Sequence, residues 1–121
     1  MPRIFITLQF EQDAQMAQKM ISEVKSAVLS LEELNLKDRR DHVSVDISFT
    51  QKDYDFKNGH FIAEVTLDKR PERTKSILDD LAYYVRIAIT RTLGSFEHKN
   101  SFGEVWTRTL DEKEEGFAST N

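Results

Sequence analysis

The sequence lacks several residue types and segments, and each absence excludes a class of protein. It contains no cysteine, which excludes disulfides, a thiolate nucleophile and cysteine-ligated metals. No apolar run is long enough to span a bilayer, and no basic N-terminal segment precedes an apolar stretch and a cleavage site. We therefore expect a cytoplasmic protein that does not bind membranes.

An excess of positive charge and grouped histidines are also missing. The formal net charge is -4, whereas a general nucleic-acid binder normally carries a basic surface. The three histidines, His42, His60 and His98, are widely separated and show no metal-ligand spacing. The sequence therefore predicts no nucleic-acid partner and no metal site.

The residues that are present form regular hydrophobic patterns. A chain of 121 residues with 39% hydrophobic residues suits one domain with one core. Every second residue is apolar along much of 3–10, which predicts a strand that Pro2 opens. Apolar residues three and four apart over 11–34 predict an amphipathic helix. Residues 42–49 alternate again, and we expect a second strand there.

The same succession of patterns then repeats. Asp, Asn and Gly residues over 50–59 indicate a loop, and the alternation over 60–67 predicts a third strand. A second amphipathic helix is predicted to begin near Pro71, which suits a first helical turn, and to stop at Gly94.

A fourth strand is predicted over 101–110, with a bulge near Gly103 because glycine inside a strand often marks one. Three apolar residues, Phe5, Ile62 and Trp106, lie on the otherwise polar sides of their strands. We therefore expect that face of the sheet to be covered by another subunit.

The order of elements predicts an α+β fold built from a duplicated β-α-β unit. Each crossover helix should connect parallel strands, giving a four-stranded mixed sheet with two helices on one face. We expect a single domain over 1–110, with halves at about 2–50 and 60–110, followed by a polar C-terminal tail over 111–121.

The first half of the chain resembles the tautomerase superfamily. The resemblance rests on the proline that starts the run "PRIFITLQFEQDAQMAQKMISEVKSAVLSL" and on the returning strand "HVSVDISF". A duplicated unit of this size within one chain is more similar to 5-carboxymethyl-2-hydroxymuconate isomerase than to the short 4-oxalocrotonate tautomerase. The likeness covers the chain from about Pro2 to Leu110 and lies in the pattern of elements.

The resemblance implies which residues would act. In this superfamily the initiator methionine is removed and the proline nitrogen serves as general base, which corresponds to Pro2. Arg40, in "RRDHVSV", matches an arginine of the isomerase branch, with Arg39 as the adjacent alternative. Arg70, in "TLDKRPERTKS", matches a second one, with Arg73 as its alternative. The resemblance assigns catalysis to Pro2, Arg40 and Arg70 and substrate binding to Arg39 and Arg73.

The activity implied is that of a cofactor-independent isomerase or tautomerase. Its substrate would be a small 2-hydroxy- or 2-oxo-dienoic acid of the kind formed in the breakdown of aromatic compounds. An arginine is suited to such a site because its planar guanidinium binds a carboxylate through two hydrogen bonds and stabilises a developing enolate. The resemblance also implies a homotrimer that needs no cofactor.

Two other functions fit the same pattern of elements. A β-α-β-β-α-β order is also that of the ferredoxin-like fold, which hosts small-ligand and ribosome-associated binding modules. An inactive tautomerase homologue is the second alternative, because Ser44 stands where the short tautomerases have an arginine within the second strand.

Overall fold

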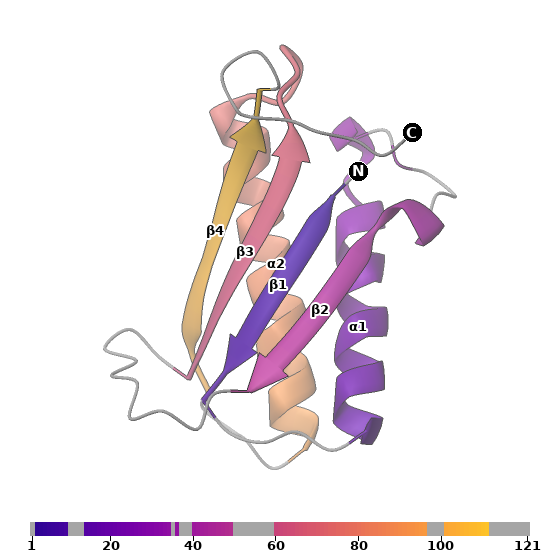
Figure 1. Cartoon of the computed structure of the whole chain (residues 1–121), viewed down its shortest axis with the longest axis vertical. Helices are drawn as coiled ribbons and strands as arrows, with labels where there is room; N and C mark the ends of the chain where they lie inside the picture. The colour runs from indigo at the N-terminus through magenta and orange to yellow at the C-terminus, as the bar shows by residue number, and fades with distance from the viewer. Residues whose placement is uncertain are drawn as a thin grey trace, which may run out of the picture.

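The computed structural model describes residues 2–9, 14–34, 36, 40–49, 60–96 and 101–111. These residues form one four-stranded sheet with the strand order β2-β1-β3-β4, and both long helices lie on the same face of it (Figure 1). The predicted α+β fold with a mixed sheet is confirmed. The elements are β1 (Arg3–Leu8), α1 (Ala14–Leu29), η1 (Glu32–Leu34), η2 (Arg40–His42), β2 (Ser44–Phe49), β3 (Phe61–Asp68), α2 (Lys75–Ser95) and β4 (Gly103–Leu110).

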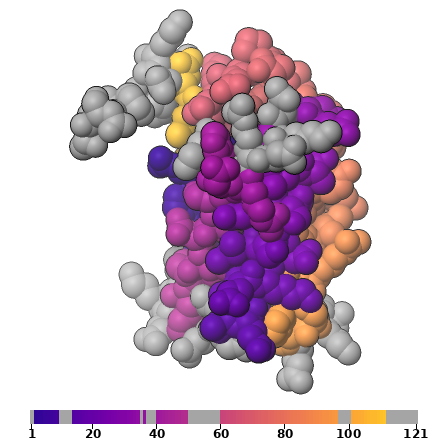
Figure 2. All heavy atoms as spheres, turned by 90° about the vertical axis from the view of Figure 1, so that its right-hand side faces the viewer, coloured from indigo at the N-terminus to yellow at the C-terminus, as the bar shows by residue number. Residues whose placement is uncertain are grey.

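The sheet combines two parallel pairs through one antiparallel junction. Strand β1 is parallel to β2, and β3 is parallel to β4, whereas the central strands β1 and β3 are antiparallel. Each parallel pair is connected through a helix, as parallel strands require. Viewed from the side, α1 and β2 lie next to one another along one edge of the molecule (Figure 2). None of the helices in the described part of the chain is long and apolar enough to cross a membrane.

The hydrophobic core fills the space between the sheet and the two helices. In β1 the apolar residues Ile4, Ile6 and Leu8 alternate with exposed or half-exposed ones and are fully buried. The buried residues of α1 recur at every fourth position from Met16 to Val28, so that they line one stripe of the helix. Burying each large aliphatic side chain stabilises the fold by roughly 1.5–3 kcal/mol before entropy is counted.

The first helix ends earlier than its sequence pattern predicts. The α-helical part stops at Leu29, and a short 3₁₀ turn, η1, contains the last apolar position of the pattern, Leu34. The hydroxyl of Ser30 donates to the Ala27 carbonyl at 2.7 Å, and such a bond competes with the helical pattern at this end. Leu31 and Leu34 are still buried, so the periodicity indicated burial correctly and helix length wrongly.

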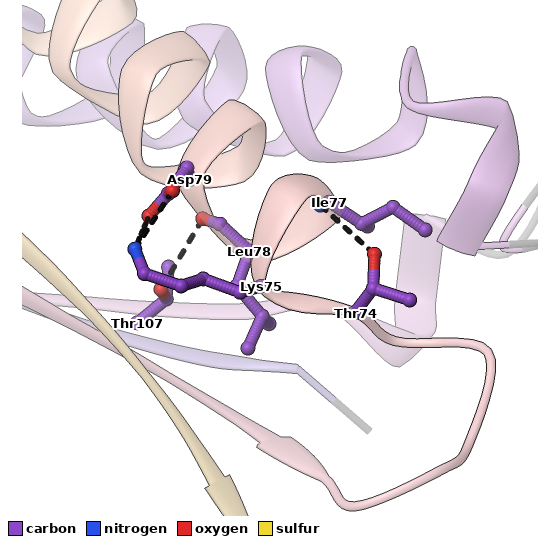
Figure 3. Close-up of polar contacts among 6 residues, drawn as sticks. All are labelled: Thr74, Lys75, Ile77, Leu78, Asp79 and Thr107. Atoms are coloured by element: carbon purple, nitrogen blue, oxygen red, sulfur yellow. Dashed lines mark hydrogen bonds and ion pairs between the residues drawn. The ribbon is translucent and has the colours of Figure 1, made fainter.

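The second helix begins later than predicted. Pro71 lies in a tight turn that the Arg73 amide closes by donating to the Arg70 carbonyl at 3.0 Å, and proline suits the second position of such a turn. Helix α2 starts at Lys75 behind the N-cap Thr74, whose hydroxyl accepts from the Ile77 amide at 3.4 Å (Figure 3). The helix also continues past Gly94 to Ser95, so the predicted glycine stop is wrong by one residue.

Contacts near its first turns tie α2 to the sheet. The Thr107 hydroxyl of β4 donates to the Leu78 carbonyl at 3.2 Å, and Lys75 forms an ion pair with Asp79 one turn later at 2.9 Å (Figure 3). The Thr107 contact links the helix to the strand. The ion pair of Lys75 lies on the exposed side of the helix and contributes little to the stability of the fold.

Strand β4 contains no bulge at Gly103, contrary to the prediction. The pairing register runs without interruption from Phe61 opposite Gly103 to Asp68 opposite Leu110. A Cβ atom at Gly103 would lie 2.6 and 2.7 Å from the Cγ and Cδ1 atoms of Phe61 and would press against the Phe61 carbonyl oxygen. The glycine is therefore needed because the buried Phe61 ring occupies the space of a side chain.

The face of the sheet opposite the helices is open in the single chain. Phe5 and Trp106 lie on it and are 44% and 60% exposed, whereas Ile62 is half-buried. The covering subunit predicted from these residues stays a prediction. Other predicted features lie outside the described residues, namely Phe10, Arg39, His98, the loop over 50–59 and the tail from 112 to 121.

Candidate active site

The candidate site lies at the end of the sheet where β1 and β2 begin and β3 and β4 finish. Pro2 is buried there, and its carbonyl oxygen accepts a hydrogen bond from the Ser44 amide at 3.1 Å. The register pairs Arg3 with Ser44 on one side and with Thr66 on the other. Pro2 therefore sits between the start of β2 and the end of β3, and Arg40, Arg70 and Arg73 lie at the same end of the sheet.

Arg40 belongs to the short turn η2 that leads into β2. Its guanidinium donates to the hydroxyl and carbonyl oxygens of Ser22, each at 3.0 Å, and to the Ser26 hydroxyl at 3.1 Å. Ser22 and Ser26 are one turn apart on α1, so the arginine attaches the loop before β2 to that helix. The structure thus brings the backbone of Arg40 close to the start of β2 but directs its guanidinium to α1.

Arg73 is the buried cation of this end, with 8% of its surface exposed. Its Nη1 atom donates to the Asp68 carbonyl at the end of β3, at 2.7 Å. Burial lowers the pKa of Arg73, and the nearby positive charge of Arg70 lowers it further, because both effects disfavour the charged form of the Arg73 guanidinium. Arg73 therefore holds the turn from the inside through both its side chain and its amide.

Arg70 lies on the same turn but is exposed. Within the part of the chain that the structure describes, its guanidinium forms no hydrogen bond or ion pair with another side chain. A guanidinium in this state can bind an incoming anion without first breaking a contact. Of the two alternatives in this cluster, Arg70 is the one presented to solvent and Arg73 is the one held by the protein.

A further cation at this end was not singled out from the sequence. The Lys69 amide donates to the Leu110 carbonyl at 2.8 Å, which continues the sheet beyond β3, and its ammonium lies 3.9 Å from the Asp111 carboxylate. The basic run "DKRPER" at the end of a strand was the available signal. No group of three or more metal-ligating side chains occurs among the described residues.

No family model matches the sequence, and no curated protein matches it at a significant level. The fold, however, is found in several solved structures. A fused 4-OT in an asymmetric trimer superimposes with a TM-score of 0.71 at 10% identity, covering 98% of this chain and 94% of that one. A protein inactivated by 2-oxo-3-pentynoate superimposes with a TM-score of 0.62 at 18% identity, covering 97% and 92%.

A third similar structure is malonate semialdehyde decarboxylase, with a TM-score of 0.55 at 11% identity, covering 98% of this chain and 92% of that one. At these identities the likeness concerns the fold and does not single out the isomerase branch that the sequence resembles. All three alignments cover nearly the whole of both chains. The chain therefore has the fold of these three structures, in agreement with the fold that the resemblance to the tautomerase superfamily implies.

Proposed function

We propose that the protein is a cofactor-independent isomerase or tautomerase acting on a small 2-hydroxy- or 2-oxo-dienoic acid, with Pro2 as its general base. The observation that carries the proposal is the position of Pro2, which is buried at the same end of the sheet as the turn that contains Arg70 and Arg73. The specific reaction most similar in pattern is isomerisation of 5-carboxymethyl-2-hydroxymuconate.

The mechanism requires removal of Met1, because the proline nitrogen is an amide as long as a residue precedes it. Once released, the secondary amine can accept a proton only in its neutral form. Burial and neighbouring cations both favour the neutral form of an amine. The base would take a proton from an enol oxygen or a carbon of the substrate and return it to another carbon, so no redox step is involved.

The arginines would supply the complementary charge. Arg70 is exposed at the correct end of the sheet, and its planar guanidinium can bind a carboxylate or an enolate oxygen through two hydrogen bonds. Arg40 would act in the same way after its guanidinium leaves Ser22 and Ser26. Arg73 is proposed to act on the substrate mainly through its charge and through the position that it gives Arg70. Arg39 is the alternative to Arg40.

Two of the similar structures support this chemistry. One is described as inactivated by 2-oxo-3-pentynoate, a small 2-oxo acid, and the other includes a variant whose N-terminal proline is replaced by alanine. The second protein has decarboxylase and hydratase activities, so the fold hosts more than one reaction on small acids. The trimeric fused 4-OT supports a homotrimer for this chain as well.

A labelling experiment on native protein tests the proposal. Intact-mass spectrometry should show loss of one methionine, and 2-oxo-3-pentynoate should then add one equivalent, which peptide mapping would place on Pro2. Pro2→Ala should lower kcat for an enol such as 2-hydroxymuconate by about 10²-fold or more, with a smaller change in KM. Retention of Met1, or unchanged activity in Pro2→Ala, would contradict the proposal. A processed but inactive protein would favour the inactive homologue.

A further inference from the structure

The guanidinium of Arg40 attaches the turn η2 to α1 at two points. Its Nη2 atom donates to the carbonyl and hydroxyl oxygens of Ser22, each at 3.0 Å, and its Nη1 atom donates to the Ser26 hydroxyl at 3.1 Å. A guanidinium is rigid and planar, so two nitrogens bound to residues one helical turn apart fix its direction as well as its position. Both serines are exposed, and serine is a weaker helix former than alanine, so their hydroxyls do not serve the helix itself.

The backbone after Arg40 extends this attachment to Pro2. The Arg40 carbonyl accepts from the Val43 amide at 3.3 Å, and the next amide along the chain, that of Ser44, donates to the Pro2 carbonyl at 3.1 Å. Apart from its nitrogen, the carbonyl is the only polar group of a proline. The bond from Ser44 therefore sets the distance between Pro2 and the start of β2.

The turn η2 depends on its polar contact with α1. None of the three residues of η2 is buried, whereas Val43, which follows the turn, is fully buried. The core thus holds the chain at the entry to β2 but does not hold the turn before it. The contact of Arg40 with Ser22 and Ser26 supplies the missing attachment.

We propose that Ser22 and Ser26 are positioning residues for Pro2, which act through the Arg40 side chain and the turn η2. The inference rests on the proposed function, because it concerns the position of the proposed base. A base must lie within hydrogen-bond reach of the proton that it takes, and a shift of about 1 Å can reduce turnover by up to roughly 10²-fold. A turn held at α1 keeps the start of β2, and with it the Pro2 carbonyl, in one place.

The proposal gives Arg40 two positions with opposite effects. Docked on α1, the side chain holds Pro2 and favours turnover. Released from α1, the guanidinium would bind a carboxylate as described above and would favour affinity. The two serines therefore raise kcat and raise KM together, whereas a contact that only stabilises the fold would not separate the two constants in this way.

This series of contacts does not involve the open face of the sheet. Helix α1 covers the face opposite to Phe5 and Trp106, and every bond between α1 and Pro2 lies within one chain (Figure 1). The role proposed for the serines is therefore independent of the way in which a neighbouring chain covers the other face.

Kinetic measurements on processed protein test the role of the serines. Replacement of both Ser22 and Ser26 by alanine should lower kcat for 2-hydroxymuconate by about tenfold, together with the lower KM that release of Arg40 implies. Replacement of both by threonine keeps the hydroxyls and should keep kcat near the wild-type value. Gln18→Ala, at an exposed position one turn before Ser22, is the matched control and should change neither constant. An unchanged kcat in the alanine pair, or a threonine pair as slow as the alanine pair, would overturn the inference.

An Arg40→Met background provides a second test, because the serines are proposed to act only through Arg40. The replacement of Ser22 and Ser26 by alanine should have no further effect on kcat in this background, since effects that share one route do not add. A further loss of similar size would show that the serines act independently of Arg40 and would overturn the inference.

Hydrogen exchange measures the attachment of Pro2 without any substrate. The Ser44 amide is protected by its bond to the Pro2 carbonyl, so the alanine pair should accelerate its exchange by about tenfold relative to the amides of β1 and β3. Equal protection of Ser44 in the wild type and the alanine pair would overturn the inference. A wild-type protein without tautomerase activity would contradict the proposed function, whereas exchange at Ser44 would still decide whether the serines hold the Pro2 carbonyl.

Discussion

Replacement of Gly103 by alanine should destabilise the protein strongly, although it adds only one methyl group. The new Cβ would lie 2.6 and 2.7 Å from two carbons of the Phe61 ring and would press against the Phe61 backbone oxygen. Neither side can move easily, because Phe61 is fully buried and Gly103 is paired with it in the sheet. Overpacking of this kind typically costs about 1–3 kcal/mol, and a clash with backbone lies at the upper end.

The same substitution at Gly94 is the matched control and should have the opposite sign. Gly94 lies within α2, and a Cβ there would meet no atom within 4 Å. Alanine in a helix is more favourable than glycine by up to about 1 kcal/mol. Gly94→Ala should therefore melt at or slightly above the wild-type temperature.

Thermal melts followed by circular dichroism at one fixed protein concentration give the melting temperatures of Gly103→Ala and Gly94→Ala. For a chain of this size each kcal/mol shifts the midpoint by roughly 4 °C. Gly103→Ala should consequently melt about 8–12 °C lower. A midpoint indistinguishable from the wild type would show that β4 can retreat from Phe61, and the argument from steric exclusion would then be wrong.

Three further substitutions test other contacts. Arg73→Leu should lower the free energy of unfolding by about 1–3 kcal/mol in urea, because it removes the part-buried hydrogen bond to the Asp68 carbonyl; an unchanged urea midpoint would refute this. Thr74→Ala removes the N-cap of α2 and should cost about 1 kcal/mol, whereas no loss would show that the cap is not formed in solution. Replacing both Ser22 and Ser26 by alanine removes two of the three hydrogen bonds that hold the Arg40 guanidinium and should lower KM for a carboxylate substrate; a raised KM would argue against a role for Arg40 in substrate binding.

The architecture could be predicted from the sequence because each strand and helix repeats a hydrophobic period. The alternation through Ile4, Ile6 and Leu8 and the fourfold spacing through α1 fix which side of each element is buried, and burial of those sides leaves few arrangements. The ends of the helices were less predictable. Ser30 ends α1 and Thr74 starts α2 through local hydrogen bonds. The energies of these bonds are small compared with the free energy of burying the apolar side chains, which is what the hydrophobic pattern indicates.

The candidate site was predictable in its location but not in the conformations of its side chains. The order of elements places Pro2 and both arginine clusters at one end of the sheet. Whether a particular guanidinium faces solvent depends on neighbours that are distant in sequence, such as Ser22 and Ser26 for Arg40. The burial of Arg73 is a similar case, since its partner, the Asp68 carbonyl, is a backbone group that no residue pattern reveals.

The antiparallel junction between β1 and β3 has a consequence for the rate at which the chain folds. Each parallel pair and its helix can form from one half of the chain, whereas a contact such as that of the Thr66 hydroxyl with the Arg3 carbonyl joins residues 63 positions apart. Closing so long a loop costs entropy that is recovered only after the central strands meet. We therefore predict that joining the two halves is the slow step. Substitutions at this junction, such as Ile6→Val, should then slow refolding, whereas those on the outer turns of α1 should mainly accelerate unfolding, which stopped-flow measurements can test.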